Sequence, residues 1–421
     1  MTRTDGVDST FNTERCHDAV VPRPVDHDAP DTSVPAFTVA GLFAGIGGLE
    51  LGLHAAGAET KLLCEVWEPA RAVLAAQFQG IPIAADVRTL KTLPDVDVVT
   101  AGFPCTDLSQ AGRTAGIHGE QSGLVTQLFR LLDSAGPRWV VIENVRNMLV
   151  LDQGKAMTYL VEQLERLGYQ WAYRLVDSRF TGVPQRRQRV IMVASRTADP
   201  REVLFADDAG EPDDDWFADD VYGFYWTEGL RGLGWAKDAL PTLKGGSALG
   251  IPSPPALWIR DAPVGTAIVT PGIRAGERMQ GFPAGWTEAA TVHSRRDGTR
   301  WKLVGNAVTV GVARWLGERL ARPGSFDPEV GVALEAGHAR WPMAAWGEKG
   351  RHVAVPVSMW PLRAPYQHLL DIVDLAEATP LSRRASEGFY SRMEKSTLRF
   401  DDAFRIAVKD HVRSMQPVSV A

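Results

Sequence analysis

The segment VAGLFAGIGGLE at residues 39–50 is an apolar strand that runs into a glycine-rich turn and then into a helix. Glycines in such a turn let the backbone approach a ligand closely at the carboxyl edge of a sheet. The dinucleotide-binding fingerprint requires a third glycine where this chain has Glu50. That departure favours a nucleoside ligand without phosphates, and a turn that serves packing alone remains the alternative.

Short apolar runs alternate with helix-like segments around this turn. Amphipathic helices are expected at residues 124–134 and 157–167. Strands are expected at residues 37–43, 61–64, 96–100, 139–142, 174–176 and 190–194. This alternation predicts an α/β fold with a mostly parallel sheet.

The composition changes along the chain and predicts four parts. Residues 1–35 are rich in Asp, Pro, Thr and Ser and are expected to form a flexible leader. Residues 36–196 carry the α/β pattern, and a helical signal at 300–322 is assigned to the same domain. Residues 197–299 have no sustained period and predict a smaller, irregular recognition domain, and residues 323–421 form a C-terminal extension of unknown role.

The overall composition limits the classes of protein. The net charge of −6 argues mildly against a nucleic-acid partner, although a whole-chain charge hides local patches. The three cysteines are too few and too scattered for a disulfide framework and show no metal-ligand spacing. No apolar run reaches the length of a membrane span, and residues 1–35 lack the layout of a signal peptide. We therefore expect a cytoplasmic protein with no membrane or metal partner.

Several polar motifs follow the expected strands. Glu65 lies about 20 residues after the turn, where an acidic residue hydrogen-bonds ribose hydroxyls. Asp86 could accept a hydrogen bond from an adenine amino group. The motif Gly-Phe-Pro-Cys ends at Cys105, and the motif Glu-Asn-Val begins at Glu143. Because the carboxyl ends of parallel strands share one edge, we expect the thiol and the carboxyl there together.

A thiol and a carboxyl at one edge suit the methylation of cytosine at C5. The ring becomes reactive at C5 once a thiolate, here Cys105, adds at C6, and an acid at ring N3, here Glu143, eases that step. The alternative for a lone cysteine is a small buried hydrophobe, which we expect of Cys16 and Cys64. Cys105 differs because a glycine and a proline precede it in a loop.

Three arginines stand just ahead of an apolar strand in the motif PQRRQR at residues 184–189. A solvated edge is one interpretation. In the functional interpretation Arg189 reaches the carbonyl of a base, while Arg186 and Arg187 meet phosphate.

Taken in order, these motifs resemble the DNA cytosine-5 methyltransferase family over roughly residues 37–320, including the segment RMQGFP at 278–283. The resemblance implies a Rossmann-like methyltransferase sheet and a target-recognition domain at residues 197–299. It implies methyl transfer from S-adenosylmethionine to cytosine C5 in double-stranded DNA, through Cys105 and a flipped-out base, with Glu143 and Arg189. The residues that it assigns to the cofactor are Phe43, Gly45, Gly47, Gly48, Glu65, Asp86, Pro104, Leu124, Asn306 and Val308.

The resemblance also leaves alternatives open. Thr106 stands where the family often has Gln, and Gly272 interrupts the usual start of the penultimate motif. A tRNA cytosine-5 methyltransferase and a DNA-binding relative without turnover remain alternatives. The long recognition region favours DNA, and the joint presence of the three catalytic residues favours an enzyme. A companion restriction endonuclease and an association with the nucleoid are compatible with this interpretation.

Overall fold

The computed structural model describes residues 35–104, 123–244, 254–293, 297–335 and 340–415. The expected leader, apart from its last residue, and the expected nucleophile Cys105 with Thr106 lie outside the described residues.

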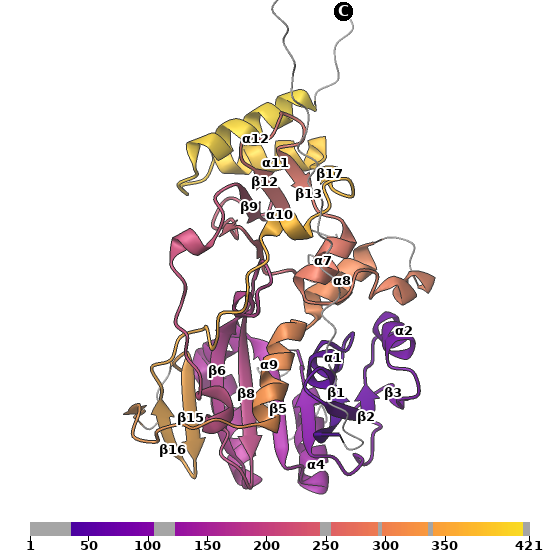
Figure 1. Ribbon diagram of the computed structural model, residues 1–421, viewed down its shortest axis with the longest axis vertical. Helices are drawn as coiled ribbons and strands as arrows, with labels where there is room; N and C mark the ends of the chain where they lie inside the picture. Colours follow the sequence, from indigo (N-terminus) through magenta and orange to yellow (C-terminus); the bar gives the residue numbers. More distant parts are fainter. Residues whose placement is uncertain (1–34, 105–122, 245–253, 294–296, 336–339, 416–421) are drawn as a thin grey trace, which may run out of the picture. The chain divides into compact units, whose positions relative to one another are not determined.

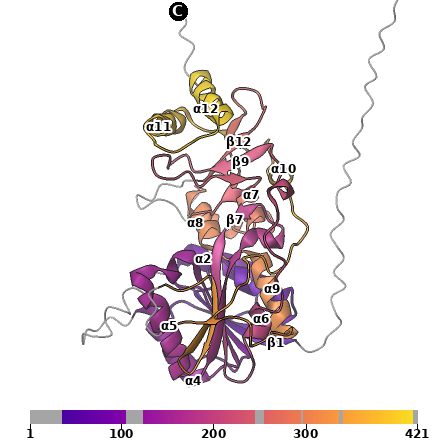
Figure 2. The ribbon, with the colours of Figure 1, turned by 90° about the vertical axis from the view of Figure 1, so that its left-hand side faces the viewer.

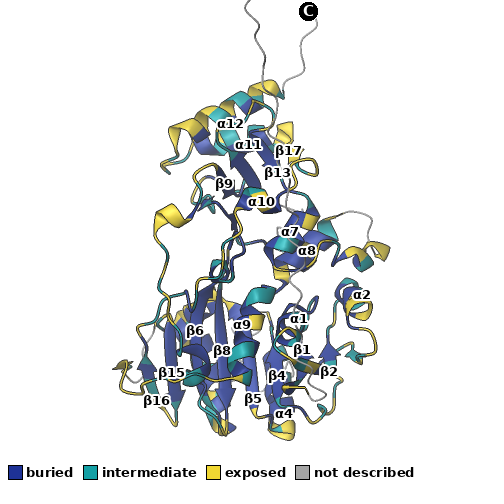
Figure 3. Cartoon of the chain, viewed as in Figure 1, coloured by how far each residue is buried: buried dark blue, intermediate teal, exposed yellow. Residues whose placement is uncertain are grey.

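The parallel half of the main sheet carries the glycine-rich turn (Figure 1). The strand β1 (Phe37–Leu42) lies between β2 (Ala58–Cys64) and β4 (Val98–Ala101). On the two outer sides, β3 (Ile83–Ala84) pairs with β2, and β5 (Trp139–Val145) pairs with β4. All four residues of β4 are buried, as is typical of a parallel strand covered by helices on both faces (Figure 3).

The other half of the main sheet is antiparallel. The strand β8 (Gln188–Ser195) pairs with β5 and with β6 (Gln170–Asp177). Beyond β6 the sheet continues through β15 (Ala344–Glu348), β16 (Arg351–Ala354) and β14 (Val332–Ala333). The strand order of this 10-stranded sheet is β14-β16-β15-β6-β8-β5-β4-β1-β2-β3.

The expected α/β fold is confirmed, but the sheet is mixed rather than mostly parallel. The reason is the connection between β6 and β8, which holds only η3 (Ser178–Thr181) and the short β7 (Gln185–Arg186). A parallel neighbour requires a crossover of roughly a dozen residues or more, usually with a helix, so this connection makes the pair antiparallel.

Helices cover both faces of the main sheet (Figure 2). One face packs against α4 (Leu124–Ala135) and α5 (Lys155–Arg166), and the other packs against α1 (Gly48–His54) and α9 (Val310–Ala321). The strand β5 shows the alternation, because Val140 and Ile142 join the first core while Trp139 and Val141 join the second. Further helices here are α2 (Glu68–Gln77) and α6 (Arg201–Leu204).

Residues 197–299, the expected recognition region, supply four strands of a second, five-stranded sheet with the order β10-β9-β12-β13-β17. Its strands are β9 (Val221–Phe224), β10 (Ala236–Lys237), β12 (Ala256–Ile259), β13 (Ile268–Thr270) and β17 (Thr379–Pro380). The helices α7 (Ile273–Met279), α8 (Gly298–Asn306) and α10 (Leu369–Ile372) share another core with this region. The strand β11 (Leu240–Pro241) pairs with β7, which joins the recognition region to the arginine motif.

The C-terminal hundred residues contribute to both sheets. They supply β14, β15 and β16 to the main sheet and β17 to the second sheet. The helices α11 (Arg383–Glu394) and α12 (Asp402–Ser414) pack on the second sheet through Phe389 and Phe404, which are buried against Phe224 and Trp258. Across the described ranges, no helix has the length and apolar character needed to cross a membrane.

Candidate active site

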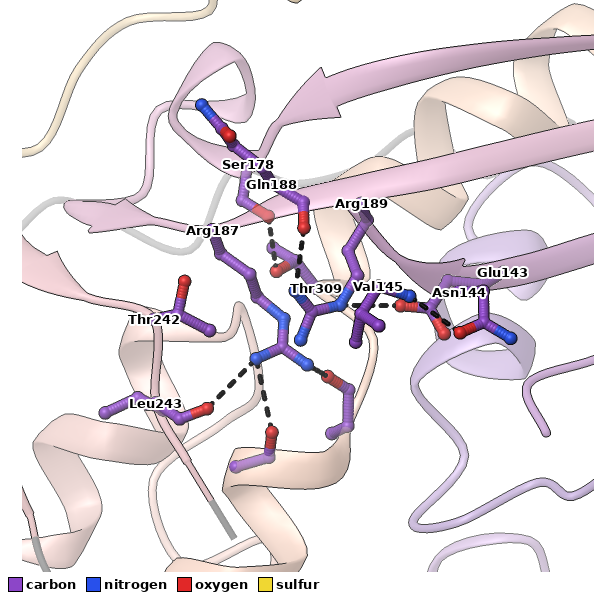
Figure 4. A network of polar contacts seen from close by, with 12 residues as sticks. Glu143, Asn144, Val145, Ser178, Arg187, Gln188, Arg189, Thr242, Leu243 and Thr309 are labelled. Carbon is purple, nitrogen blue, oxygen red and sulfur yellow. Dashed lines mark hydrogen bonds and ion pairs between the residues drawn. The ribbon is translucent and has the colours of Figure 1, made fainter. Parts of the chain in front are cut away.

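Two of the expected catalytic residues lie on neighbouring antiparallel strands. Glu143 is on β5 and Arg189 is on β8, where Arg189 is the register partner of Val145. Side chains two residues apart in register lie on the same face of the pair. Arg189 Nε lies 2.8 Å from Glu143 Oε1. Figure 4 shows the two side chains pointing toward one another. Burial lowers the pKa of the Arg189 guanidinium, and the charge of Glu143 opposes that shift.

Asn144 ties the end of β5 to the loop that leads to Cys105. Its Nδ2 donates a hydrogen bond to the carbonyl oxygen of Phe103 at 3.1 Å, and its Oδ1 accepts one from the backbone N–H of Val145 at 2.9 Å. A Cβ at Gly102 would lie 3.6 Å from Glu143 Oε2. The described beginning of the loop therefore lies beside the carboxyl of Glu143. Sequence reasoning noted Asn144 only as part of a motif and gave it no role.

Arg187 does not fit the phosphate contact expected of it. Its side chain is buried, with 1% exposed. The guanidinium donates to the carbonyl oxygens of Leu243 at 3.2 Å, Gly305 at 3.2 Å and Ala307 at 2.7 Å (Figure 4). Desolvation lowers its pKa most, and the nearby Arg189 lowers it further. We therefore replace the expectation for Arg187 with a positioning role: it joins the arginine motif to α8 and the recognition region.

A cavity of about 730 Å³ opens beside the Glu143–Arg189 pair. Arg189 lines it together with three further cationic residues, Arg146, Arg186 and Lys244. Arg186 is exposed, unlike its neighbour Arg187. Asn306, expected to bind the cofactor, also lines this cavity. The cavity is within the size range of small-ligand sites, and its cationic lining suits a phosphate-bearing substrate.

The glycine-rich turn lies at the carboxyl end of β1 and is held by Glu65. The Oε2 of Glu65 accepts from the backbone N–H of Gly45 at 2.8 Å, and its Oε1 accepts from that of Trp67 at 2.7 Å. Burial raises the pKa of the Glu65 carboxyl, and these backbone hydrogen bonds oppose the shift. The backbone of Phe43, Gly45 and Gly47 has positive φ, at 57°, 57° and 83°. Gly45 and Gly47 adopt this conformation without the steric cost that a side chain brings.

The three expected cofactor glycines differ in what surrounds them. A Cβ on Gly48 would meet the carbonyl oxygen of Val308 at 2.5 Å, and one on Gly47 would collide with the ring of Phe78. A Cβ on Gly45 would meet no atom within 4 Å. Packing therefore explains Gly47 and Gly48, whereas Gly45 faces open space that a ligand can approach.

The remaining expected cofactor residues lie on several elements. Asp86 follows β3 and pairs with Arg88 at 2.6 Å, and hydrogen bonds from Arg88 lower the pKa of its carboxyl. The ring of Phe43 meets that of Phe103 edge to face, with 6.0 Å between centroids. Pro104 is the last residue described before the gap in the loop, and Leu124 begins α4 after it.

A further thiol lies at the end of β2, away from the expected nucleophile loop in the sequence. Cys64 is buried at the end of β2, and burial raises the pKa of its thiol to about 12, so it suits packing and not nucleophilic attack. Among the described residues, no group of three or more His, Cys, Asp or Glu side chains could hold a metal ion.

The sequence is similar to a known family and to known proteins over much of its length. Residues 37–214 match the family model described as C-5 cytosine-specific DNA methylase. The chain is 47% identical over 379 residues to the Type II methyltransferase M2.BsuMI of Bacillus subtilis (strain 168), covering 87% of this chain and 96% of that protein. It is 36% identical over 163 residues to the Type II methyltransferase M.Bsp6I of Bacillus sp. (strain RFL6), covering 38% of this chain and 52% of that protein.

A solved structure has a similar fold. The crystal structure of the S. pombe Dnmt2 methyltransferase matches with a TM-score of 0.51 at 17% sequence identity, covering 68% of this chain and 98% of that one. At this identity the likeness concerns the fold alone.

Proposed function

The chain belongs to the C-5 cytosine-specific DNA methylase family and is a DNA cytosine-5 methyltransferase, and we propose that it acts through Cys105, Glu143 and Arg189. The observation that carries this assignment of residues is the Glu143–Arg189 ion pair beside Gly102, where the loop that leads to Cys105 begins. The reacting cytosine is extruded from the duplex so that its ring can reach such a site.

The proposed reaction overcomes the low reactivity of cytosine C5 as a nucleophile. The Cys105 thiol loses its proton, and its sulfur forms a bond to C6 of the ring. In its protonated form Glu143 hydrogen-bonds ring N3 and donates its proton there as negative charge builds. C5 then accepts the methyl group as its bond to the sulfonium sulfur of the donor breaks, and the donor would leave as a neutral thioether. A base removes the C5 proton, N3 returns its proton to Glu143, and the bond between the Cys105 sulfur and C6 breaks. The ring regains its double bond and Cys105 regains its thiol.

In this proposal Arg189 positions both Glu143 and the base. Its Nε holds the carboxylate of Glu143, and its Nη1 donates to the carbonyl oxygen of Gln188 at 2.7 Å. The guanidinium also lines the cavity of about 730 Å³, so its remaining N–H groups can meet the carbonyl oxygen of the cytosine.

We propose S-adenosylmethionine as the methyl donor, which supplies an electrophilic sulfonium methyl group when bound. The open approach to Gly45 and the carboxyl of Glu65 next to it suit a nucleoside-containing ligand. The residues proposed to hold it are Phe43, Gly45, Gly47, Gly48, Glu65, Asp86, Pro104, Leu124, Asn306 and Val308. Among these, Gly47 and Gly48 act by letting the turn pack closely.

The proposed substrate is double-stranded DNA, with Arg186 at a phosphate near the cavity. Residues 36–196 and 300–322 are proposed as the catalytic domain, to whose sheet the C-terminal extension adds β14, β15 and β16, and residues 197–299 as the target-recognition domain. The similarity to a Type II methyltransferase supports a role beside a companion restriction endonuclease. The proposed place of action is the cytoplasm, on the DNA of the nucleoid.

Expression in a host without DNA methylation tests this function. We expect bisulfite sequencing of the host DNA to show protected cytosines within one short sequence motif. The Cys105→Ala variant, expressed at the same level, is expected to leave every cytosine convertible.

The same experiment separates the alternatives. If soluble wild-type protein leaves DNA unmethylated while tRNA from the same cells gains 5-methylcytosine, the enzyme acts on RNA. If both nucleic acids remain unmethylated, the interpretation of this protein as an active enzyme is wrong and a binding protein is favoured.

A further inference from the structure

A second cavity, of about 450 Å³, lies where the recognition strands meet the C-terminal extension. Its lining includes Arg186, Tyr222, Trp235, Leu398, Arg399 and Phe400. Three separate stretches of the chain thus meet there: the arginine motif, the second sheet and the segment before α12. Most of this lining lies beyond residues 37–214, the part of the chain that matches the family model.

The extension is built into the recognition region at this place. Phe404 of α12 packs against Trp235 and Phe224, with 4.9 and 5.0 Å between ring centroids. The guanidinium of Arg392 on α11 donates to the carbonyl oxygens of Trp226 at 2.6 Å and Glu228 at 3.0 Å. The position of residues 398–401 is therefore set by the same core that supports the recognition strands.

The walls of this cavity are aromatic. Tyr222 stacks on Trp235 with 4.6 Å between centroids and an angle of 22° between the ring planes. Trp235 and Phe400 are half-buried, and both line the cavity. Aromatic rings of this kind bind nucleobases by stacking, with little dependence on base identity.

The charge at the cavity is positive. Arg186 and Arg399 are both exposed. The acidic residue in the lining, Asp401, is already engaged: its Oδ1 accepts from the backbone N–H groups of Ala403 and Phe404 at 2.8 and 3.1 Å, and its Oδ2 lies 3.8 Å from Arg260. The lining therefore offers two exposed arginines beside a carboxylate that is already engaged, which suits a phosphate group.

Arg186 lines both this cavity and the one beside Glu143 and Arg189. A DNA strand whose target cytosine enters the first cavity would therefore pass Arg186 on its way to the second. The volume of the second cavity is in the range of about 300–1,000 Å³ typical of small-ligand sites, which suits one nucleotide and not a protein segment.

We propose that this second cavity binds a nucleotide that flanks the target cytosine, with its base on the rings of Trp235 and Phe400 and its phosphate at Arg399 and Arg186. The C-terminal extension is then part of the DNA-binding surface. This inference rests on the proposed function, because it requires duplex DNA as the substrate.

Fluorescence anisotropy with a labelled duplex that carries the methylated motif tests the proposal. The Arg399→Gln variant is expected to bind more weakly and to lower the slope of log K against log salt by about 1, the value for one lost phosphate contact. Phe400→Leu keeps an apolar side chain but loses stacking, so we expect roughly fivefold or greater weakening at an unchanged salt slope. Arg384→Gln, an exposed arginine of α11 outside the cavity lining, is the matched control and should bind as the wild type does.

The outcomes separate this inference from the function itself. If the wild type methylates DNA and Arg399→Gln keeps both its affinity and its salt slope, the second cavity is not a nucleotide site. An equal loss in Arg384→Gln would also overturn the proposal, because the effect would then be general surface charge. If the wild type binds no duplex at all, the proposed function fails and the inference with it.

Discussion

The carboxylate of Glu143 and the guanidinium of Arg189 form an ion pair across β5 and β8, with 2.8 Å between Oε1 and Nε and 10% of each side chain exposed. Such a shielded pair is weakly screened by salt and holds the carboxylate in one orientation. The pair therefore fixes the orientation of the Glu143 carboxyl group beside the cavity that Arg189 lines.

Glu143→Gln should keep the shape of this site and remove its proton donor. We expect the methylation rate to fall by roughly 10²–10⁴-fold, the usual contribution of general acid catalysis, with little change in DNA affinity. Single-turnover methylation with labelled cofactor measures the rate, and anisotropy measures the affinity. A variant that methylates at the wild-type rate would remove Glu143 from the mechanism.

Arg186 and Arg187 should respond differently to substitution although they are adjacent. Arg187→Gln leaves buried carbonyl oxygens without their charged donor, so the free energy of unfolding should fall by about 2–3 kcal/mol. Arg186→Gln changes an exposed side chain, so stability should stay within about 0.5 kcal/mol while DNA binding weakens. Urea unfolding and duplex binding measure both effects. The reverse pattern would show that Arg187 is the phosphate contact after all.

Glu50 should make the stability depend on pH. It is fully buried, Thr100 Oγ1 donates to its Oε1 at 3.1 Å, and its Oε2 has no hydrogen-bond partner within the part of the chain that the structure describes. Burial raises the pKa of this carboxyl to about 7. The folded state thus holds a proton that the unfolded state releases above its ordinary pKa of about 4.3.

The sign of the effect follows from that raised pKa. The contribution of Glu50 is fully present below the unfolded pKa, declines as the pH rises, and is lost above about 7. The total loss is about 4 kcal/mol, from about 1.4 kcal/mol for each pKa unit between the unfolded and folded values. Glu50→Gln cannot ionise, so the stability difference between variant and wild type should change across this range. Urea unfolding at several pH values gives that difference, and a constant difference would contradict the account.

The glycine-rich turn offers a matched pair of substitutions. Gly48→Ala places a methyl group against the carbonyl oxygen of Val308, so it should lower stability by about 1–3 kcal/mol. Gly45→Ala meets no protein atom and carries only the cost of positive φ, about 1–2 kcal/mol, but its methyl group enters the space left for the ligand. We expect Gly45→Ala to lose S-adenosylmethionine binding in calorimetry while it stays folded. Wild-type affinity in this variant would mean that the ligand does not approach Gly45.

The sequence predicted those strands and helices in which apolar residues recur at the regular spacing of a buried face. The expected helix at 124–134 is α4 (Leu124–Ala135), and the expected strand at 139–142 is the first part of β5. The strand continues to Val145, so Glu143 lies within it and not after it. The apolar run ends before Glu143, the expected catalytic residue. The backbone pairing of β5 with β8 continues to Val145.

Other features depend on tertiary context that a linear pattern does not hold. Strand β15 reads AAWGE, which has no alternation, and it forms because it pairs with β6 far away in the sequence. Arg187 stands in a run of basic residues that favours exposure, yet carbonyl groups from distant segments make its burial possible. The local sequence pattern likewise did not predict that α12 packs on the second sheet.

Covalent trapping tests the central claim most directly. A duplex with 5-fluorocytosine at the methylated position should leave Cys105 bonded to C6, because the fluorine at C5 cannot leave as a proton does. With S-adenosylmethionine present, the account predicts a protein–DNA adduct that survives a denaturing gel and maps by mass spectrometry to the peptide containing Cys105. Active wild-type enzyme that forms no such adduct, or an adduct that persists in Cys105→Ala, would contradict it.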